Sequence, residues 1–91
     1  MIPYQQYKAK IDWLTGTLLE WSKENTAGMP MRRFEIRQML ADVEEYWGGG
    51  WQADPEQIEE FMENHSEGEG YLVKASDVQS VFIKYEKEFN K

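Results

Sequence analysis

Apolar side chains recur along this chain every three or four residues, the spacing that places them on one face of an α-helix. Four such stripes are present, two in each half of the chain. In the first half they comprise Tyr7, Ile11, Leu14, Leu18 and Trp21, then Ile36, Met39, Leu40, Val43 and Trp47. In the second half they comprise Ile58, Phe61 and Met62, then Val78, Val81, Phe82, Tyr85 and Phe89. The pattern predicts an all-α fold of four amphipathic helices around one core.

A run of three glycines separates the two halves. Residues 48–50 lack Cβ atoms, so a helix that crossed them would lose a large amount of backbone entropy. We therefore expect a glycine-rich hinge at 48–50, between one helix-loop-helix unit over residues 3–47 and a second over residues 54–90. The 91 residues are enough for a small single domain, which we predict over residues 1–91.

Local signals mark where the two helices of the second half begin. Asp54, Pro55 and Gln57 form a capping-box pattern, with proline at the first helical position and glutamine three residues after the cap. Ser76 is followed three residues later by Gln79, and this pattern predicts that Ser76 caps the last helix.

The two halves show a weak internal repeat. The stripes of the second and fourth predicted helices have the same spacing at an offset of 42 residues, which aligns Gly28 with Gly70. Any two amphipathic helices can be slid into register, so coincidence is the competing explanation. If the repeat is real, the segments at residues 29–31 and 71–73 would lie side by side as a minimal two-stranded contact between the loops.

Composition narrows the class of protein. Hydrophobic residues make up 41% of the chain and aromatic residues 14%, which is ample material for a packed core. The absence of cysteine excludes disulfides, thiolate metal sites and cysteine nucleophiles. No apolar run approaches the length of a membrane span, and the first residues lack the pattern of a signal peptide. We expect a cytoplasmic protein with no membrane partner.

Negative charge is concentrated in the second half of the chain. The formal net charge is −7, and residues 51–91 carry ten acidic and four basic side chains, whereas residues 1–50 carry seven and six. Residues 54–69 contain seven carboxylates and no Lys or Arg. A field of this sign repels nucleic-acid phosphates and attracts basic partners.

Two aromatic residues border this acidic stretch. Aromatic side chains beside charged ones are common in the hot spots of protein interfaces, so Trp51 and Tyr71 are candidate anchors for a partner. The predicted partner-binding residues are Trp51, Glu56, Glu59, Glu60, Glu63, Glu67, Glu69 and Tyr71.

A secondary basic patch lies at the start of the second predicted helix. Arg32, Arg33 and Arg37 are clustered there, and the N-terminus of a helix favours anions. The patch is a candidate contact for phosphate or an acidic partner. The alternative is a solvated helix end whose arginines pair with local Glu35 or with the acidic second half of the chain.

The sequence contains no constellation typical of catalysis or metal binding. The two units resemble EF-hands in outline only. With Gly70 at loop position six, His65 and Ser76 would occupy positions one and twelve, where Ca²⁺ requires carboxylates. A single histidine without cysteine is too little for a zinc site, and Trp51 follows residues 48–50 where a phosphate-binding loop has Lys. We expect no enzyme activity, no cofactor and no metal.

Taken together, these patterns favour a non-catalytic acidic protein-binding module. It would be a small inhibitor or adaptor that docks on a basic surface of a larger partner, such as a nucleic-acid-handling enzyme. Phage-type and immunity-type inhibitors that mimic nucleic-acid charge share this composition, and the analogy rests on composition alone. Two alternatives stay open: an assembly component that homo-oligomerises, and an anion or nucleic-acid binder acting through Arg32, Arg33 and Arg37. The chain could be a monomer or a homodimer, and the charge makes direct nucleic-acid binding the less favoured interpretation.

Overall fold

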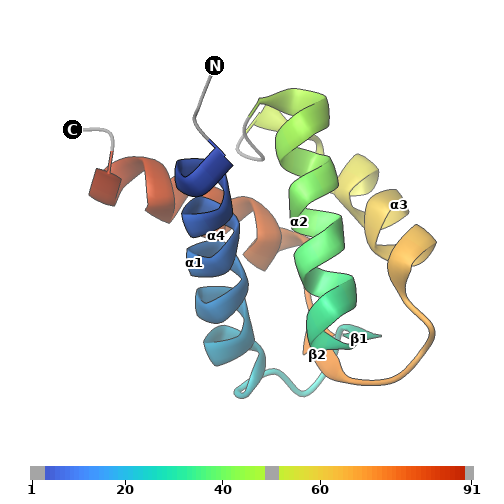
Figure 1. Cartoon of the computed structure of the whole chain (residues 1–91). Helices are drawn as coiled ribbons and strands as arrows, with labels where there is room; N and C mark the ends of the chain where they lie inside the picture. The colour runs from blue at the N-terminus through green and yellow to red at the C-terminus, as the bar shows by residue number, and fades with distance from the viewer. Residues whose placement is uncertain (1–3, 49–51, 90–91) are drawn as a thin grey trace.

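Four helices and a small antiparallel sheet make up the computed structural model, which describes residues 4–48 and 52–89 (Figure 1). The elements in chain order are α1 (Tyr4–Ser22), β1 (Met29–Met31), α2 (Arg33–Trp47), α3 (Pro55–His65), β2 (Tyr71–Val73) and α4 (Ala75–Phe89). The predicted four-helix fold with two helix-loop-helix units is confirmed. Of the predicted hinge, Gly48 is described and residues 49–50 lie outside the described residues.

All four predicted stripes supply the core. Helix α1 packs on α2 and α4, and α3 packs on the same two helices, so their apolar faces converge. Among the described residues, the fully buried side chains include Ile11, Leu14, Leu18, Met31, Ile36, Met39, Leu40, Val43, Ile58, Met62, Val73, Val78, Val81 and Phe82. The aromatic ends of the stripes lie at the edge of the core and are partly buried: Tyr7, Trp21, Trp47, Phe61 and Tyr85. Phe89 is the most exposed stripe residue, at 53%, and packs its ring edge-on against Trp13, with 5.5 Å between centroids.

The predicted start of α3 is confirmed. A carboxylate oxygen of Asp54 accepts a hydrogen bond from the backbone N–H of Glu56 at 2.9 Å, and Gln57 Oε1 accepts one from the backbone N–H of Asp54 at 3.4 Å. At the C-terminal end of α2, Gly48 adopts the left-handed conformation (φ 70°), and its backbone N–H donates to the carbonyl of Glu44. Both ends of the glycine-rich connection are thus fixed by local capping.

The prediction that Ser76 caps the last helix is wrong. Helix α4 begins at Ala75, two residues before the position that a cap at Ser76 requires, and Ser76 lies exposed in its first turn. The backbone carbonyl of Lys74 accepts hydrogen bonds from the N–H groups of Asp77 and Val78, so the helix starts directly from the end of β2. The strand pairing fixes residue 73 and leaves no room for a separate cap at 76.

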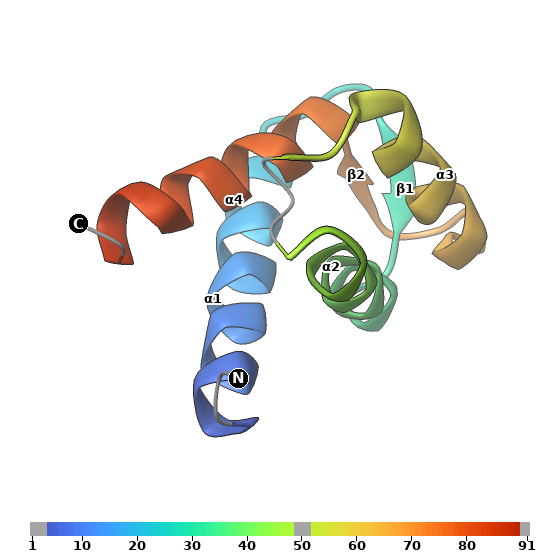
Figure 2. The same cartoon turned by 90° about the horizontal axis from the view of Figure 1, so that it is seen from above.

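The minimal two-stranded contact between the loops is confirmed. Strands β1 and β2 pair antiparallel, with Met29 opposite Val73 and Met31 opposite Tyr71. Figure 2 shows the two strands between α3 and the beginning of α4. Strand β1 contacts α3 and β2 contacts α1, so the sheet joins the two halves of the chain.

A glycine precedes each strand and lies against the backbone of the other strand. Gly28 and Gly70 have φ angles of 147° and 122°, which side chains rarely adopt. A Cβ atom on Gly28 would lie 2.8 Å from the carbonyl oxygen of Val73, and one on Gly70 would overlap the carbonyl of Met31. The offset that aligned these two glycines in the sequence therefore relates two positions with the same local geometry.

A buried ion pair links three of the helices. Lys10 Nζ lies 2.8 Å from Glu44 Oε1, with both side chains less than a tenth exposed, and 3.9 Å from Glu86 Oε1 on α4. The ammonium also lies 4.9 Å from the centre of the Tyr85 ring. The second oxygen of Glu44 is buried without a hydrogen-bond partner among the described residues. The charges of Lys10 and Glu44 are therefore compensated mainly by each other.

Candidate protein-interaction surface

Helix α3 presents a row of carboxylates to solvent. Its core side is formed by Ile58 and Met62, and the helical repeat therefore places the residues between and around them on the outer side. Four exposed glutamates lie there, and we call them the acidic face of α3: Glu56, Glu59, Glu60 and Glu63. Among the described residues, none of these side chains forms an ion pair.

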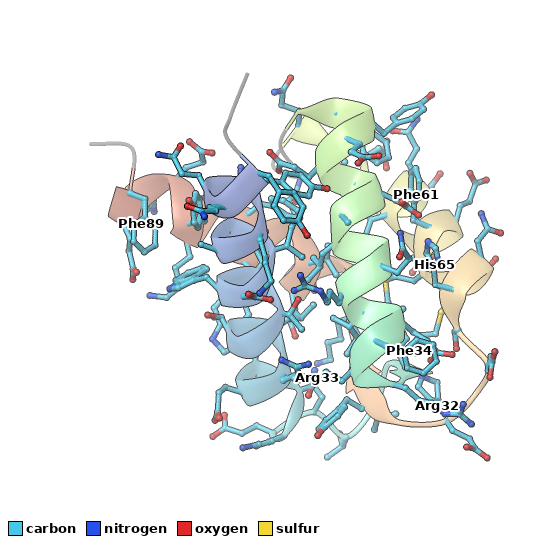
Figure 3. The ribbon with its side chains drawn as sticks, viewed as in Figure 1. Arg32, Arg33, Phe34, Phe61, His65 and Phe89 are labelled. Atoms are coloured by element: carbon cyan, nitrogen blue, oxygen red, sulfur yellow. The ribbon has the colours of Figure 1, made fainter. Side chains whose placement is uncertain are left out.

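The other two predicted glutamates are already paired. Arg32 Nη1 lies 3.2 Å from Glu67 Oε2, and Arg32 Nη2 lies 2.6 Å from Glu69 Oε2. The hydrogen bond with Glu69, followed by the negative charges of Glu69 and Glu67, raises the pKa of the Arg32 guanidinium above its ordinary value. Figure 3 shows Arg32 projecting from the base of α2 toward the segment that follows α3. The freely available carboxylates are therefore those of α3 itself.

The two predicted aromatic anchors have different outcomes. Trp51 lies outside the described residues. Tyr71 is the first residue of β2, opposite Met31, and 41% of it is exposed. Its role as a partner anchor stays a prediction.

The predicted basic patch does not present three free guanidinium groups. Arg32 binds Glu67 and Glu69, Arg37 forms an ion pair with Asp12 of α1, and Arg33 is exposed at the start of α2. The alternative that these arginines pair with local Glu35 or with the acidic second half thus describes Arg32 alone, because the partner of Arg37 is Asp12 of α1.

Asp12 offers a test of this part of the structure. Hydrogen bonding by Lys8, whose Nζ lies 3.0 Å away, and next the charge of Arg37, lower the pKa of the Asp12 carboxyl below its ordinary value. The stabilising contribution is present at neutral pH and is lost as the pH falls through this lowered pKa. We expect a carboxyl-detected NMR titration to place the Asp12 midpoint below that of a free aspartate, and Lys8→Met to raise it. An unchanged midpoint in that variant would contradict the pairing.

The single histidine ties two helices together. His65 Nε2 lies 2.6 Å from Asp42 Oδ2, which joins the last residue of α3 to the middle of α2. The next residue, Ser66, donates its hydroxyl to the carbonyl of Pro30 in β1. Both contacts hold the C-terminal end of α3 in place. The helix that carries the acidic face is therefore held in a fixed position against α2 and β1.

Neither a metal centre nor a membrane-spanning helix is found in the part of the chain that the structure describes. Across residues 4–48 and 52–89, no group of three or more His, Asp or Glu side chains is arranged to hold a metal ion. None of the described helices combines the length and the apolar composition that crossing a bilayer requires.

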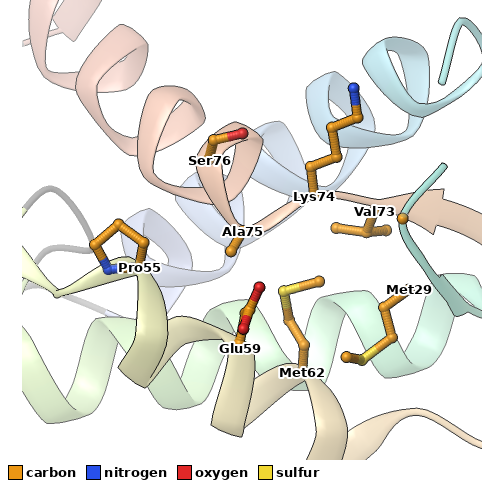
Figure 4. A pocket seen from close by; sticks show the side chains of 9 residues that line it. Met29, Pro55, Glu59, Met62, Val73, Lys74, Ala75 and Ser76 are labelled. Carbon is orange, nitrogen blue, oxygen red and sulfur yellow. The ribbon is translucent and has the colours of Figure 1, made fainter.

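Two surface features were missed by the sequence analysis. A groove with a volume of about 540 Å³ lies between α3 and the beginning of α4, with Met29, Met62 and Val73 among its lining residues (Figure 4). At the junction of α2 and α3, the rings of Tyr46, Trp47 and Phe61 pack edge to face, and Tyr46 is 72% exposed. The lining residues of the groove come from three separate segments, so no local sequence signal could have found it.

The comparisons with known proteins add no relative. No protein-family model, no curated protein and no solved structure matches this chain. The functional argument therefore rests on the chemistry of the surface itself.

Proposed function

We propose that this chain is a non-catalytic acidic binding protein, a small inhibitor or adaptor that docks through the acidic face of α3 on a basic surface of a larger protein. One observation carries the proposal. Four exposed carboxylates lie on one side of a helix whose other side is fixed in the core, and no described Lys or Arg is paired with them.

The electrostatics of such a surface favour a basic partner. Exposed carboxylates on one helix face produce a local field that raises the rate of encounter with positive surfaces. Because no described ion pair neutralises them, a partner would not have to displace an internal cation. A nucleic-acid-handling enzyme has a surface of the required sign because it must attract phosphate. The carboxylates of α3 would then lie where phosphates bind, in the manner of a phage-type or immunity-type inhibitor in the cytoplasm.

Charge reversal tests this proposal. Once the partner has been captured from the native host, we expect Glu60→Lys with Glu63→Lys to slow association about tenfold at low salt. A matched control, Glu20→Lys with Glu24→Lys, makes the same change in net charge at exposed positions of α1 and the following turn, and is expected to have little effect. Stopped-flow or biosensor measurements over a range of ionic strength would report both.

The outcome that would contradict the proposal is equally clear. Association that is independent of ionic strength, and unaffected by reversal at positions 60 and 63, would show that the acidic face of α3 only solubilises the protein. Equal effects of the two double variants would show that total charge acts, and not a docking surface.

A second candidate function is self-assembly, and exposed aromatic side chains favour it. Phe34 is 62% exposed on α2, and Tyr46 on the same helix is more exposed still. Large apolar side chains in water are often covered in an oligomer. Sedimentation analysis of the chain alone distinguishes this candidate, because assembly gives a mass that rises with concentration. The third candidate, an anion or nucleic-acid binder, is less supported because Arg32 and Arg37 are ion-paired.

A further inference from the structure

The groove between α3 and α4 adjoins the acidic face of α3. The buried side chains of Met62 and Val73 form its floor, and the partly buried side chains of Met29 and Ala75 lie beside them (Figure 4). Methionine is flexible and polarisable, so a surface made from it adapts to apolar side chains of different shape. A volume of about 540 Å³ is ample for one such side chain.

One residue belongs to both features. Glu59 lines the groove and is also a member of the acidic face, and Figure 4 shows its carboxylate beside Met62. Lys74 lines the groove as well, but its side chain extends away from Glu59 in this view, and no ion pair joins these two described residues. The rim of the groove on the side of α3 is therefore negative.

We propose that this groove receives an aliphatic side chain from a basic amphipathic helix of the partner, while lysines or arginines of that helix lie on the acidic face of α3. The inference rests on the proposed function and names the partner element it requires. An amphipathic helix presents apolar and charged side chains three or four residues apart. The groove and the acidic face lie equally close together on α3, because Glu59 at the groove is three residues from Glu56 and four from Glu63.

Charge complementarity selects this occupant over a second copy of the chain. A copy that docked here symmetrically, groove to groove, would bring its own carboxylates toward Glu59 and Glu63, because residues 54–69 contain no Lys or Arg. Like charges at an interface oppose binding. A basic helix brings the opposite charge to the same place and supplies an apolar side chain for the groove that Met29 and Met62 line.

Methionine methyl NMR tests the inference with defined peptides. The probe is a synthetic amphipathic helix with Leu on one face and Lys on the other. One matched peptide carries Ala for Leu, and another carries Glu for Lys. We expect the Leu/Lys peptide to shift the methyl signals of Met29, which is partly exposed, and of Met62 at the floor of the groove. The methyl signals of Met31 and Met39, which are buried and do not line the groove, should stay in place. The Ala/Lys peptide is expected to shift only backbone amides of α3, and the Leu/Glu peptide is expected to shift neither set.

A substitution that fills the groove provides the second measurement. Ala75→Leu adds bulk to the lining at the first turn of α4, and Ala9→Leu is a matched control at an exposed position of α1. We expect Ala75→Leu to weaken binding of the Leu/Lys peptide about tenfold and Ala9→Leu to leave it unchanged. If Ala75→Leu fails to fold, Ser76→Leu replaces it with the same expected loss, because Ser76 also lines the groove, is exposed and carries no charge.

The outcomes separate the two proposals. If saturating Leu/Lys peptide shifts amides of α3 but not the methyls of Met29 and Met62, the groove inference is wrong and acidic docking stands. If neither basic peptide shifts any amide of α3, the proposed function is wrong as well. If those methyls shift with protein concentration alone, a second copy covers the groove, which also overturns the inference.

Discussion

Replacing Gly70 with alanine is expected to destabilise the fold by about 3 kcal/mol, because two unfavourable effects add. The φ angle of 122° disfavours any side chain, and the new Cβ atom would overlap the backbone carbonyl of Met31 across the sheet. Backbone atoms of a paired strand cannot move aside as a flexible side chain does. Urea unfolding followed by tryptophan fluorescence would measure the loss.

Two other glycines separate these effects. Gly68 also has a positive φ, 89°, but nothing lies within 4 Å of the place that a Cβ atom would take there, so Gly68→Ala should cost about 1 kcal/mol from the backbone alone. Gly16 lies inside α1 in open space, and Gly16→Ala should stabilise the protein by up to about 1 kcal/mol. Equal losses for Gly70→Ala and Gly68→Ala would contradict the close approach of the two loops.

Replacing Lys10 with methionine is expected to cost about 3 kcal/mol, because it leaves a buried carboxylate without its cation. Glu44 is 8% exposed, and its second oxygen already lacks a partner among the described residues. Methionine approximates the volume of the lysine stem, so the loss reports charge and not a cavity. Chemical denaturation near neutral pH would measure it.

A double substitution and an exposed pair serve as controls. Lys10→Met with Glu44→Leu removes both charges and should recover most of the stability, since apolar pairs of similar volume often replace buried ion pairs without loss. Lys8→Met removes one partner of an exposed pair with Asp12 and should change stability by less than about 1 kcal/mol. If Lys10→Met lowered the free energy of unfolding no more than Lys8→Met, the buried carboxylate of Glu44 would not depend on the charge of Lys10.

The architecture could be predicted because its signals are local. Helical spacing located the four helices, Asp54 with Gln57 marked the start of α3, and the short segments around Pro30 and Leu72 paired as the repeat required. The outcome at Ser76 shows the limit of local patterns. A serine in a capping context did not become the cap, because pairing of β2 with β1 determined where the chain turns into α4.

The details of the surface could not be predicted, because they depend on contacts between distant residues. The pairing of Arg32 with Glu67 and Glu69 joins positions 35 and 37 residues apart, and the pairing of Lys10 with Glu44 joins positions 34 apart. The sequence gives the number of carboxylates in residues 54–69 but does not show which of them lie beside a cation. The stripe of α3 did indicate the outward direction of Glu56, Glu59, Glu60 and Glu63.

The ion pairs of Arg32 with Glu67 and Glu69 divide the acidic stretch into free carboxylates on α3 and neutralised ones after it. A partner whose footprint ends near Ser66 meets carboxylates that are immediately available. A partner that reaches farther must exchange its own cation for Arg32, so Glu67 and Glu69 contribute little net attraction even where they are touched. The unpaired carboxylates would then determine which area a partner recognises. A small partner that covers only the α3 carboxylates would bind as tightly as a larger one that also covers Glu67 and Glu69.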